Sequence, residues 1–170
     1  LNLILNKNFN NINNDINFES NNELTTFKDL EHNYIFLING KINSTSFNYE
    51  EKNKILITDY CQKDKFYFNP ENSLSLLNNA LSFGGFSLEI TKNYKLKKPL
   101  VIYNYFSEDL KNKILNNKNS IILNEGSELT LINYTDDSIQ NNFIKNTLDK
   151  VFIEGNANLK NILIQNSKSN

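Results

Sequence analysis

The chain has 170 residues and a formal net charge of −1 at pH 7, from 18 basic and 19 acidic residues. This length suits one domain, and a near-neutral charge provides no basic field for nucleic acid or an anionic membrane. All 18 basic residues are lysines, so arginine, the usual planar donor to phosphates and base edges, is missing. We therefore expect neither a nucleic-acid partner nor a membrane partner.

Three further features of the composition bear on the origin of the chain. The 35 asparagines, with abundant lysine and isoleucine, indicate an AT-biased genome more than a functional demand. Methionine is absent even at position 1, so we expect the chain to begin inside a longer reading frame or after a processing cut. The single cysteine, Cys61, forbids an internal disulfide and fits a reducing, cytoplasmic location. No apolar run reaches the roughly 18–20 residues of a membrane span, and residues 1–4 are too short for a signal-peptide core.

The first half of the chain begins with polar sequence and continues with strand patterns. Residues 1–24 are rich in Asn, which predicts either a frayed helix or a tail. Residues 34–38 are β-branched and aromatic, Asn39-Gly40 favours a type I′ turn, and Ile42 begins a return strand. Residues 54–58 predict a further strand.

One helix is expected next. Asn69 is a suitable N-cap, and Pro70 occupies the first helical position. Helical spacing places three leucines on one face: Leu74, Leu77 and Leu81. The glycines at 84–85 then predict the end of the helix.

After residue 85 the apolar period changes from 3.6 to 2. Phe86, Leu88 and Ile90 alternate with polar residues, as in a half-buried strand. Pro99 is compatible with a strand over 100–102 only at its start or at an edge, and 107–115 predict a short helix or a loop insertion. The remaining strand candidates are 121–123, 129–132, 150–153 and 159–164.

A strand–turn–strand pattern occurs three times. Its apolar anchors are Ile90 with Leu96, Leu123 with Leu129, and Ile153 with Leu159, and the first anchors are 33 and then 30 residues apart. Such a period is typical of stacked arrays, which form surfaces and scaffolds more readily than catalytic pockets. We expect the three segments to lie one above another with a shared interior, and the last repeat to expose an unpaired, aggregation-prone edge.

The turns of these repeats also correspond. Gly126 and Gly155 fall in equivalent turns, and Asn93 takes the comparable place in the first copy. Asn is the non-glycine residue that best tolerates a left-handed backbone.

Several blocks occur in a fixed order along the chain: residues 84–90 (GGFSLEI), 96–100 (LKKPL), 119–127 (NSIILNEGS) and 156–159 (NANL). Together they resemble the SufB/SufD family of iron–sulfur cluster assembly scaffolds, its SufD members in particular, and residues 34–40 are similar to an N-terminal strand and turn of that family. The resemblance covers roughly residues 34 to 166, and its specificity comes from the order and spacing of the blocks.

The resemblance implies a mainly β fold, with a mixed helix and strand region over 1–83 and the first coils of a right-handed parallel β-helix over 84–170. It implies pairing with a SufB-like paralogue and a SufC-like ATPase. An iron–sulfur cluster belongs to the full complex, and we expect no cofactor on this chain. Because the chain stops at Asn170, part-way through the β-helix, no catalytic, cofactor-binding or metal residue can be carried over.

Two pairs of residues could hold a metal. Cys61 and His32 are 29 residues apart with no third ligand nearby, so an ordinary strand-end cysteine and a surface-turn histidine are favoured. Asp136-Asp137 could be catalytic carboxylates or a calcium site, but no further acidic cluster accompanies them, and a solvated loop is favoured.

A group of lysines and a group of aromatic residues could each be either functional or structural. A basic patch is explained best by strand-edge lysines that deter unwanted pairing: Lys92, Lys95, Lys97 and Lys98. An aromatic group could be a ligand platform, but core and inter-coil stacking is favoured: Phe66, Tyr67, Phe68, Tyr103, Tyr105 and Phe106.

Two classes of function remain open. The sequence has no Gly-rich phosphate loop or nucleophile elbow, so ATP hydrolysis would belong to a partner. The first class is a non-enzymatic assembly scaffold. The alternative is a carbohydrate-binding or adhesive β-helix, which would need an upstream secretion signal and an acidic or aromatic stripe on one strand face.

Overall fold

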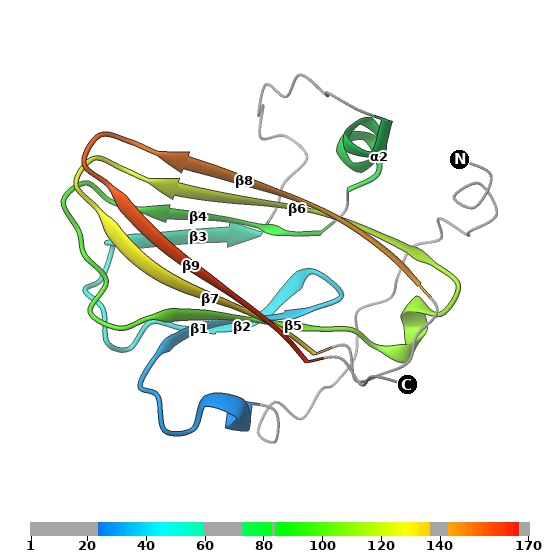
Figure 1. Ribbon diagram of the computed structural model, residues 1–170, viewed down its shortest axis with the longest axis horizontal. Coiled ribbons are helices and arrows are strands. Elements are labelled where there is room, and N and C mark those ends of the chain that lie inside the picture. Colours follow the sequence, from blue (N-terminus) through cyan, green and yellow to red (C-terminus); the bar gives the residue numbers. More distant parts are fainter. Residues whose placement is uncertain (1–23, 60–72, 83, 137–142, 167–170) are drawn as a thin grey trace.

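Two facing β-sheets make up most of the protein (Figure 1). The computed structural model describes residues 24–59, 73–82, 84–136 and 143–166. The first sheet has the order β2 (Lys41–Ser46), β1 (Asn33–Ile38), β5 (Leu100–Tyr105), β7 (Glu128–Asp136) and β9 (Asn158–Asn166). The second has the order β3 (Ile55–Asp59), β4 (Phe86–Ile90), β6 (Ile114–Leu123) and β8 (Ile144–Ile153). The prediction of a mainly β protein is confirmed.

Helical structure within the described residues is short. The α-helix α2 (Ser73–Leu81) lies on the outer side of the second sheet, near β6 and β8 (Figure 1). Two 3-10 turns are present, η1 (Leu24–Phe27) and η2 (Glu108–Leu110). The η2 turn falls in 107–115, where a short helix or a loop insertion was predicted. Apart from Leu24, the Asn-rich residues 1–24 lie outside the described residues.

The three repeats stack in register, as predicted. Strands β4, β6 and β8 pair in parallel, so Ile90 lies opposite Leu123 and Leu123 opposite Ile153. Strands β5, β7 and β9 pair in parallel in the other sheet, with Leu129 opposite Leu159. Each repeat therefore contributes one strand to each sheet, and the turns between them lie together at one end of the molecule (Figure 1).

The strands before residue 83 extend these same sheets. β1 pairs in parallel with β5, and β3 pairs antiparallel with β4. β2 returns antiparallel to β1 through Asn39-Gly40, whose φ angles of 50° and 78° are both positive. This confirms the predicted type I′ hairpin. Pro99 directly precedes β5, in agreement with its prediction at a strand start.

The core lies between the two sheets. Alternate residues of β4 are buried, which confirms the period of two, and Ile90 and Leu123 are both 0% exposed. They belong to one apolar cluster that also contains Leu100 and Leu129. Ile153 differs, because it is 52% exposed in the last strand of its sheet, where no described strand covers it.

The three turns that join the strands of each repeat adopt the same backbone conformation. Asn93, Gly126 and Asn156 have φ angles of 59°, 69° and 59°, and each follows its anchor residue by three positions. Gly126 and Gly155 lie in equivalent turns, as predicted, but the left-handed residue of the third turn is Asn156, one position after Gly155. Asn tolerates the left-handed conformation in the first and third copies, and glycine adopts it in the second.

The face that α2 turns toward the sheet is not the predicted one. Leu74 and Leu81 are exposed, and the buried residue of the helix is Asn78. The Asn78 amide donates hydrogen bonds to the carbonyl oxygens of Asn117 and Asn146, at 2.9 and 2.7 Å. The helix is thus joined to β6 and β8 through a polar contact. Its predicted start at Asn69 and Pro70 lies outside the described residues.

The two glycines after α2 have a different role from the one predicted. The helix ends at Leu81, before the glycines, and Ser82 bonds back to the Asn78 carbonyl oxygen. Gly85 has a φ of +126°, and a Cβ there would lie 2.0 Å from the Lys118 carbonyl oxygen. Glycine is needed because the backbone of β6 passes so close.

Candidate functional site

The end of the stack formed by β8 and β9 exposes apolar side chains. Each strand is the last of its sheet, so neither has a neighbour on its outer side among the described residues. Val151, Ile153 and Leu163 are 43%, 52% and 76% exposed there. The last strand of a sheet, with apolar side chains beside it, is a surface on which a further strand can pair. The predicted exposed edge is confirmed for the described strands; its tendency to aggregate stays a prediction.

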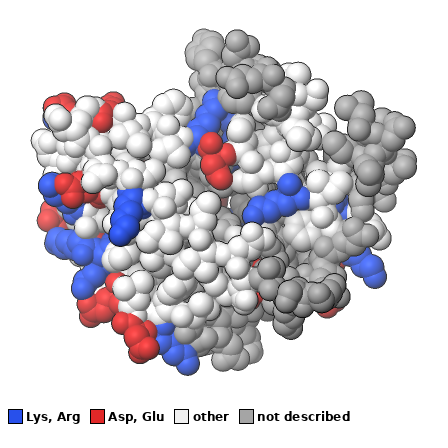
Figure 2. All heavy atoms as spheres, viewed as in Figure 1, with Lys and Arg blue, Asp and Glu red and all other residues white. Residues whose placement is uncertain are grey.

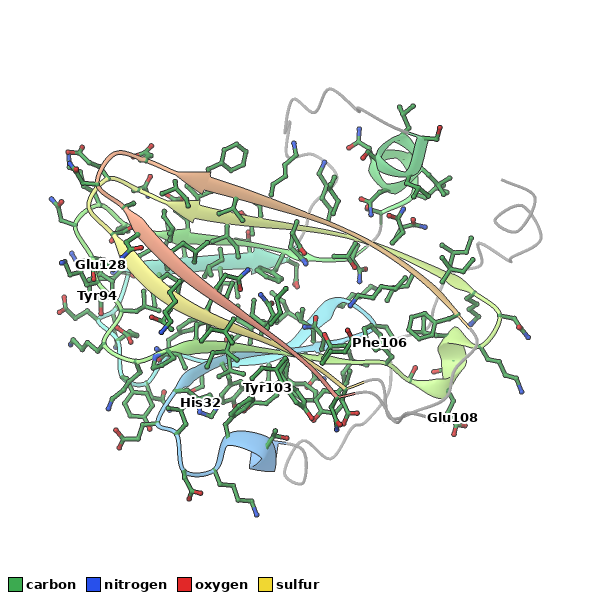
Figure 3. All side chains as sticks on the ribbon, in the orientation of Figure 1. His32, Tyr94, Tyr103, Phe106, Glu108 and Glu128 are labelled. Atoms are coloured by element: carbon green, nitrogen blue, oxygen red, sulfur yellow. The ribbon has the colours of Figure 1, made fainter. Side chains whose placement is uncertain are left out.

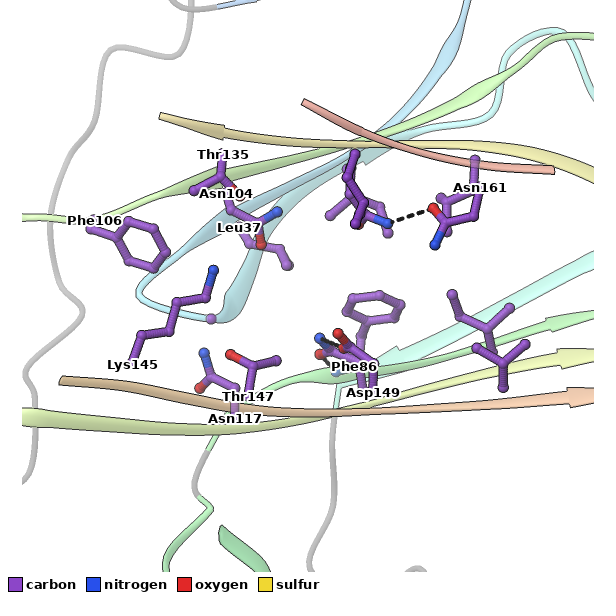
Figure 4. Close-up of a pocket in the computed structure, with 18 of the residues that line it drawn as sticks. Leu37, Phe86, Asn104, Phe106, Asn117, Thr135, Lys145, Thr147, Asp149 and Asn161 are labelled. Atoms are coloured by element: carbon purple, nitrogen blue, oxygen red, sulfur yellow. Dashed lines mark hydrogen bonds between the residues drawn. The ribbon is translucent and has the colours of Figure 1, made fainter. Parts of the chain in front are cut away.

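A cavity of about 250 Å³ lies between the sheets and reaches this end (Figure 4). Its lining is partly apolar, with Phe86 and Ile121, and partly polar. The polar side chains project from strands of both sheets: Asn104, Asn117, Thr135, Lys145, Thr147 and Asp149. A polar lining is unusual between packed sheets and requires hydrogen-bond partners.

Amide side chains on successive strands supply some of those partners. Asn119 Nδ2 donates to Asp149 Oδ1 at 2.7 Å, and Asn133 Nδ2 donates to Asn161 Oδ1 at 3.1 Å. A third bond of this kind joins Asn146 to Asn116 at 2.9 Å. These amide ladders add side-chain bonds to the backbone pairing, so they help to fix the register of each repeat on the next.

Near the turns, the half-buried carboxylate of Glu50 connects two loops. Glu50, between β2 and β3, accepts hydrogen bonds from Asn33 Nδ2 at 2.8 Å and Tyr94 Oη at 2.7 Å. It also accepts from the backbone N–H groups of Lys97 and Lys98, at 3.1 and 3.2 Å. Burial raises the pKa of the Glu50 carboxyl, but these hydrogen bonds outweigh it and hold the pKa below its ordinary value.

The predicted basic patch is electrically balanced. Lys92 pairs with Glu125, and Lys95 with Glu128, each across one repeat. Figure 2 shows lysine and carboxylate side chains intermixed at the end of the molecule where the turns lie. The interpretation as strand-edge lysines was wrong, because β4 is flanked by β3 and β6, and these lysines lie in the connection that follows it.

His32 is half-buried beside Tyr103, below the first sheet (Figure 3). His32 Nδ1 donates to the Leu30 carbonyl oxygen at 2.6 Å, and Nε2 is hydrogen-bonded to Tyr103 Oη at 2.9 Å. Burial raises the pKa of Tyr103 to about 12, so the phenol keeps its proton. His32 thus anchors the segment before β1 to the sheet; Cys61 lies outside the described residues.

The aromatic residues stack between strands, as predicted. Tyr103 meets Tyr134 edge-on at 5.9 Å, and Tyr105 stacks on Phe36 at 5.1 Å, all on the outer face of the first sheet. Phe106 belongs to a separate cluster with Leu110 and Leu115. Phe66, Tyr67 and Phe68 lie outside the described residues.

Only the first residue of the Asp136-Asp137 pair lies within the described part of the chain. Asp136 ends β7, and Asp137 lies outside the described residues. In the described ranges no three His, Cys, Asp or Glu side chains are grouped as a metal site would require. Within the same ranges, no helix has the length and apolar character needed to cross a membrane.

The sequence did not predict the cavity or the contacts of Glu50. The repeat offered a signal for the amide ladders, since Asn119 and Asp149, like Asn116 and Asn146, are separated by the 30-residue period. No such signal marks Glu50, whose partners come from β1 and from the connection between β4 and β5.

We compared the chain with known proteins. No protein-family model matches it, and no curated protein matches it significantly.

Proposed function

We propose that this chain is a non-enzymatic scaffold subunit of a SUF-type iron–sulfur cluster assembly complex in the cytoplasm. In this proposal the two facing sheets are the early coils of a right-handed parallel β-helix. The chain pairs with a SufB-like subunit and a SufC-like ATPase. The iron–sulfur cluster is a property of the full complex, and this chain holds no cofactor of its own.

The observation that carries the proposal is the parallel pairing of equivalent strands from successive repeats. Ile90, Leu123 and Ile153 follow one another across the second sheet, and Leu129 and Leu159 across the first. Repeats that contact only their neighbours form extended surfaces, which suit assembly with other subunits. The exposed edge of β8 and β9 supports an assembly role because it offers both backbone pairing and apolar contact.

The location of the family-like blocks supports the same proposal. Residues 84–90 contain the whole of β4, residues 119–127 form the end of β6 and its turn, and residues 156–159 form the next turn and the start of β9. The blocks therefore fall on strands and turns of three successive repeats. Because the resemblance lies at positions that determine the stacking, it supports the fold directly. It supports the function only by way of the family.

The test is co-purification from the native cells. The tagged chain should recover a SufB-like and a SufC-like protein, identified by mass spectrometry. Lys95→Ala, at an exposed ion pair, should recover both, whereas Leu123→Asp should recover neither because a carboxylate in the core disrupts the stack. Recovery of neither protein by the unaltered, folded chain would overturn the proposal.

The carbohydrate-binding or adhesive alternative has less support. It calls for an exposed aromatic or acidic stripe along one strand face. The aromatic row on the first sheet is buried instead, with Tyr103 at 0% and Tyr134 at 4% exposure. Sequence upstream of Leu1 that encodes a secretion signal would favour this alternative.

A further inference from the structure

The turn between β1 and β2 contains a chemically reactive dipeptide. Asn39-Gly40 is the one Asn-Gly pair in the sequence, and glycine has no Cβ to hinder attack by its backbone nitrogen on the preceding carboxamide. In that attack the Gly40 nitrogen bonds to Asn39 Cγ, while the side-chain NH2 group leaves with the Gly40 amide proton as ammonia. Water then opens the resulting cyclic imide at either carbonyl carbon, so that residue 39 becomes aspartate or isoaspartate.

The fold holds the Asn39 carboxamide away from this reaction. Asn39 is 0% exposed, and its Nδ2 donates to Ser107 Oγ at 2.8 Å while its Oδ1 accepts from the Ser107 N–H at 3.0 Å. Its backbone N–H donates to the Tyr105 carbonyl oxygen at 3.0 Å. Both ends of the carboxamide are thus fixed by one residue of the connection after β5. Closure of the imide requires the carboxamide to turn toward its own backbone, so both bonds to Ser107 must break first.

Gly40 is immobilised as well, from the other side of the turn. Its φ is +78°, and a Cβ at this position would lie 1.8 Å from Asn117 Nδ2. Ile38, at the end of β1, pairs with Lys41 in β2 and with Tyr105 in β5. The reactive dipeptide therefore lies in a packed, hydrogen-bonded region, and the attack requires this region to open.

The products do not fit the closed hairpin. An aspartate at position 39 would place a carboxylate where the side chain is 0% exposed, and the donor to Ser107 Oγ would be lost. The Ser107 hydroxyl already donates to Asp109 Oδ2 at 3.3 Å, so two carboxylates would compete for one proton. An isoaspartate adds a carbon atom to the backbone, which disturbs the register of β2 on β1. Deamidation therefore opposes renewed closure of the hairpin.

We infer that Asn39 is a deamidation site that the folded chain protects, with Ser107 as the residue that holds its carboxamide away from the Gly40 nitrogen. Opening of the β1–β2 hairpin removes this protection, and the reaction then makes the opening permanent. Each molecule thus keeps a chemical record of having opened. The inference is independent of the proposed scaffold function, because the reaction needs water and no partner subunit.

Peptide mapping by mass spectrometry measures the reaction. The unaltered chain would be incubated for increasing times in mildly alkaline buffer, with and without guanidinium chloride, and then digested after lysine. Asn39 lies in the peptide 29–41 together with Asn33, and fragmentation of the peptide distinguishes the two. The proposal expects Asn39 to deamidate in denaturant and at least about tenfold more slowly in buffer, because packed, hydrogen-bonded segments open rarely.

Variants separate the hold on the carboxamide from general packing. Ser107→Ala removes the bond to Nδ2 and should speed deamidation of Asn39 in buffer about fivefold, the factor expected for one hydrogen bond. Ser107→Thr keeps a hydroxyl and should keep the protection. Thr45→Ala, at an exposed position of β2, is the matched control and should react like the unaltered chain. In denaturant all these proteins should react at one rate, and circular dichroism would confirm that each is folded in buffer.

Two results would contradict the proposal. The first is an equal rate of deamidation at Asn39 with and without denaturant, which would show that the fold gives no protection. The second is a folded Ser107→Ala variant that reacts as slowly as Thr45→Ala, which would show that Ser107 does not hold the carboxamide. The comparison of buffer with denaturant keeps the test decisive if Ser107→Ala unfolds. None of these results affects the co-purification test of the scaffold function.

Discussion

Leu123→Ala is the most direct test of the stacked core. Leu123 is 0% exposed and lies between Ile90 and Ile153 in the second sheet. The substitution removes three carbon atoms from the place where consecutive repeats meet. Its effect therefore reports whether the repeats share one interior.

The expected magnitude follows from this burial. Three buried carbons at about 0.8 kcal/mol each give a transfer cost of about 2.4 kcal/mol. The cavity left behind adds to this, so we expect a loss of about 3 kcal/mol in the free energy of unfolding, within the usual range for buried Leu→Ala changes. For a chain of this size the melting temperature should fall by about 6–12 °C.

Leu163→Ala is the matched control. The side chain of Leu163 is 76% exposed at the open end of the stack, so only about a quarter of the transfer cost applies, about 0.6 kcal/mol. Urea unfolding followed by circular dichroism would measure both variants, with unchanged m-values as the condition for comparison. Equal midpoints for Leu123→Ala and Leu163→Ala would refute the shared interior.

Three further predictions concern the loops and turns. Glu50→Gln should lower stability by about 1–3 kcal/mol at pH 7, because it replaces an acceptor of four donors. The pKa of Glu50 is lower in the folded protein, so its contribution to stability is present above the unfolded pKa of about 4.3 and is lost as pH falls through the folded pKa. Urea unfolding at pH 7 and pH 3 should therefore show the difference in the free energy of unfolding between the two proteins shrinking at pH 3. A difference that stays constant would contradict this. Lys95→Ala should change stability by no more than about 1 kcal/mol, because its ion pair with Glu128 is exposed, and thermal melts would reveal any larger effect. Gly126→Ala should destabilise by about 1–2 kcal/mol in the same melts, since φ is +69° there and a Cβ would lie 2.4 Å from Asn93 Oδ1; an unchanged melting temperature would argue against the turn geometry.

The sequence allowed the placement of strands wherever apolar residues alternate or recur. Ile90 and Leu123 were assigned to a stacked interior from spacing alone, and the register confirms it. The length of β6 was underestimated because residues 116–119 are mostly Asn and show no apolar alternation. Their side chains pair with the next strand instead, and that pairing depends on a register 30 residues away.

The helix shows a second limit of sequence reasoning. Helical spacing put Leu74 and Leu81 on one face, but spacing does not say what covers that face. The sheet contacts Asn78 instead, whose amide donates hydrogen bonds to strand carbonyl oxygens. No local sequence pattern predicts these bonds.

The Asn78 amide has a mechanical consequence. One nitrogen bridges carbonyl oxygens on two neighbouring strands, and the Asn78 Oδ1 is itself held by Ser82. Sliding β8 past β6 would break both bridging bonds together, so shear between these strands is opposed by a contact outside the sheet. Pulling α2 away from the molecule should therefore loosen two successive repeats at once.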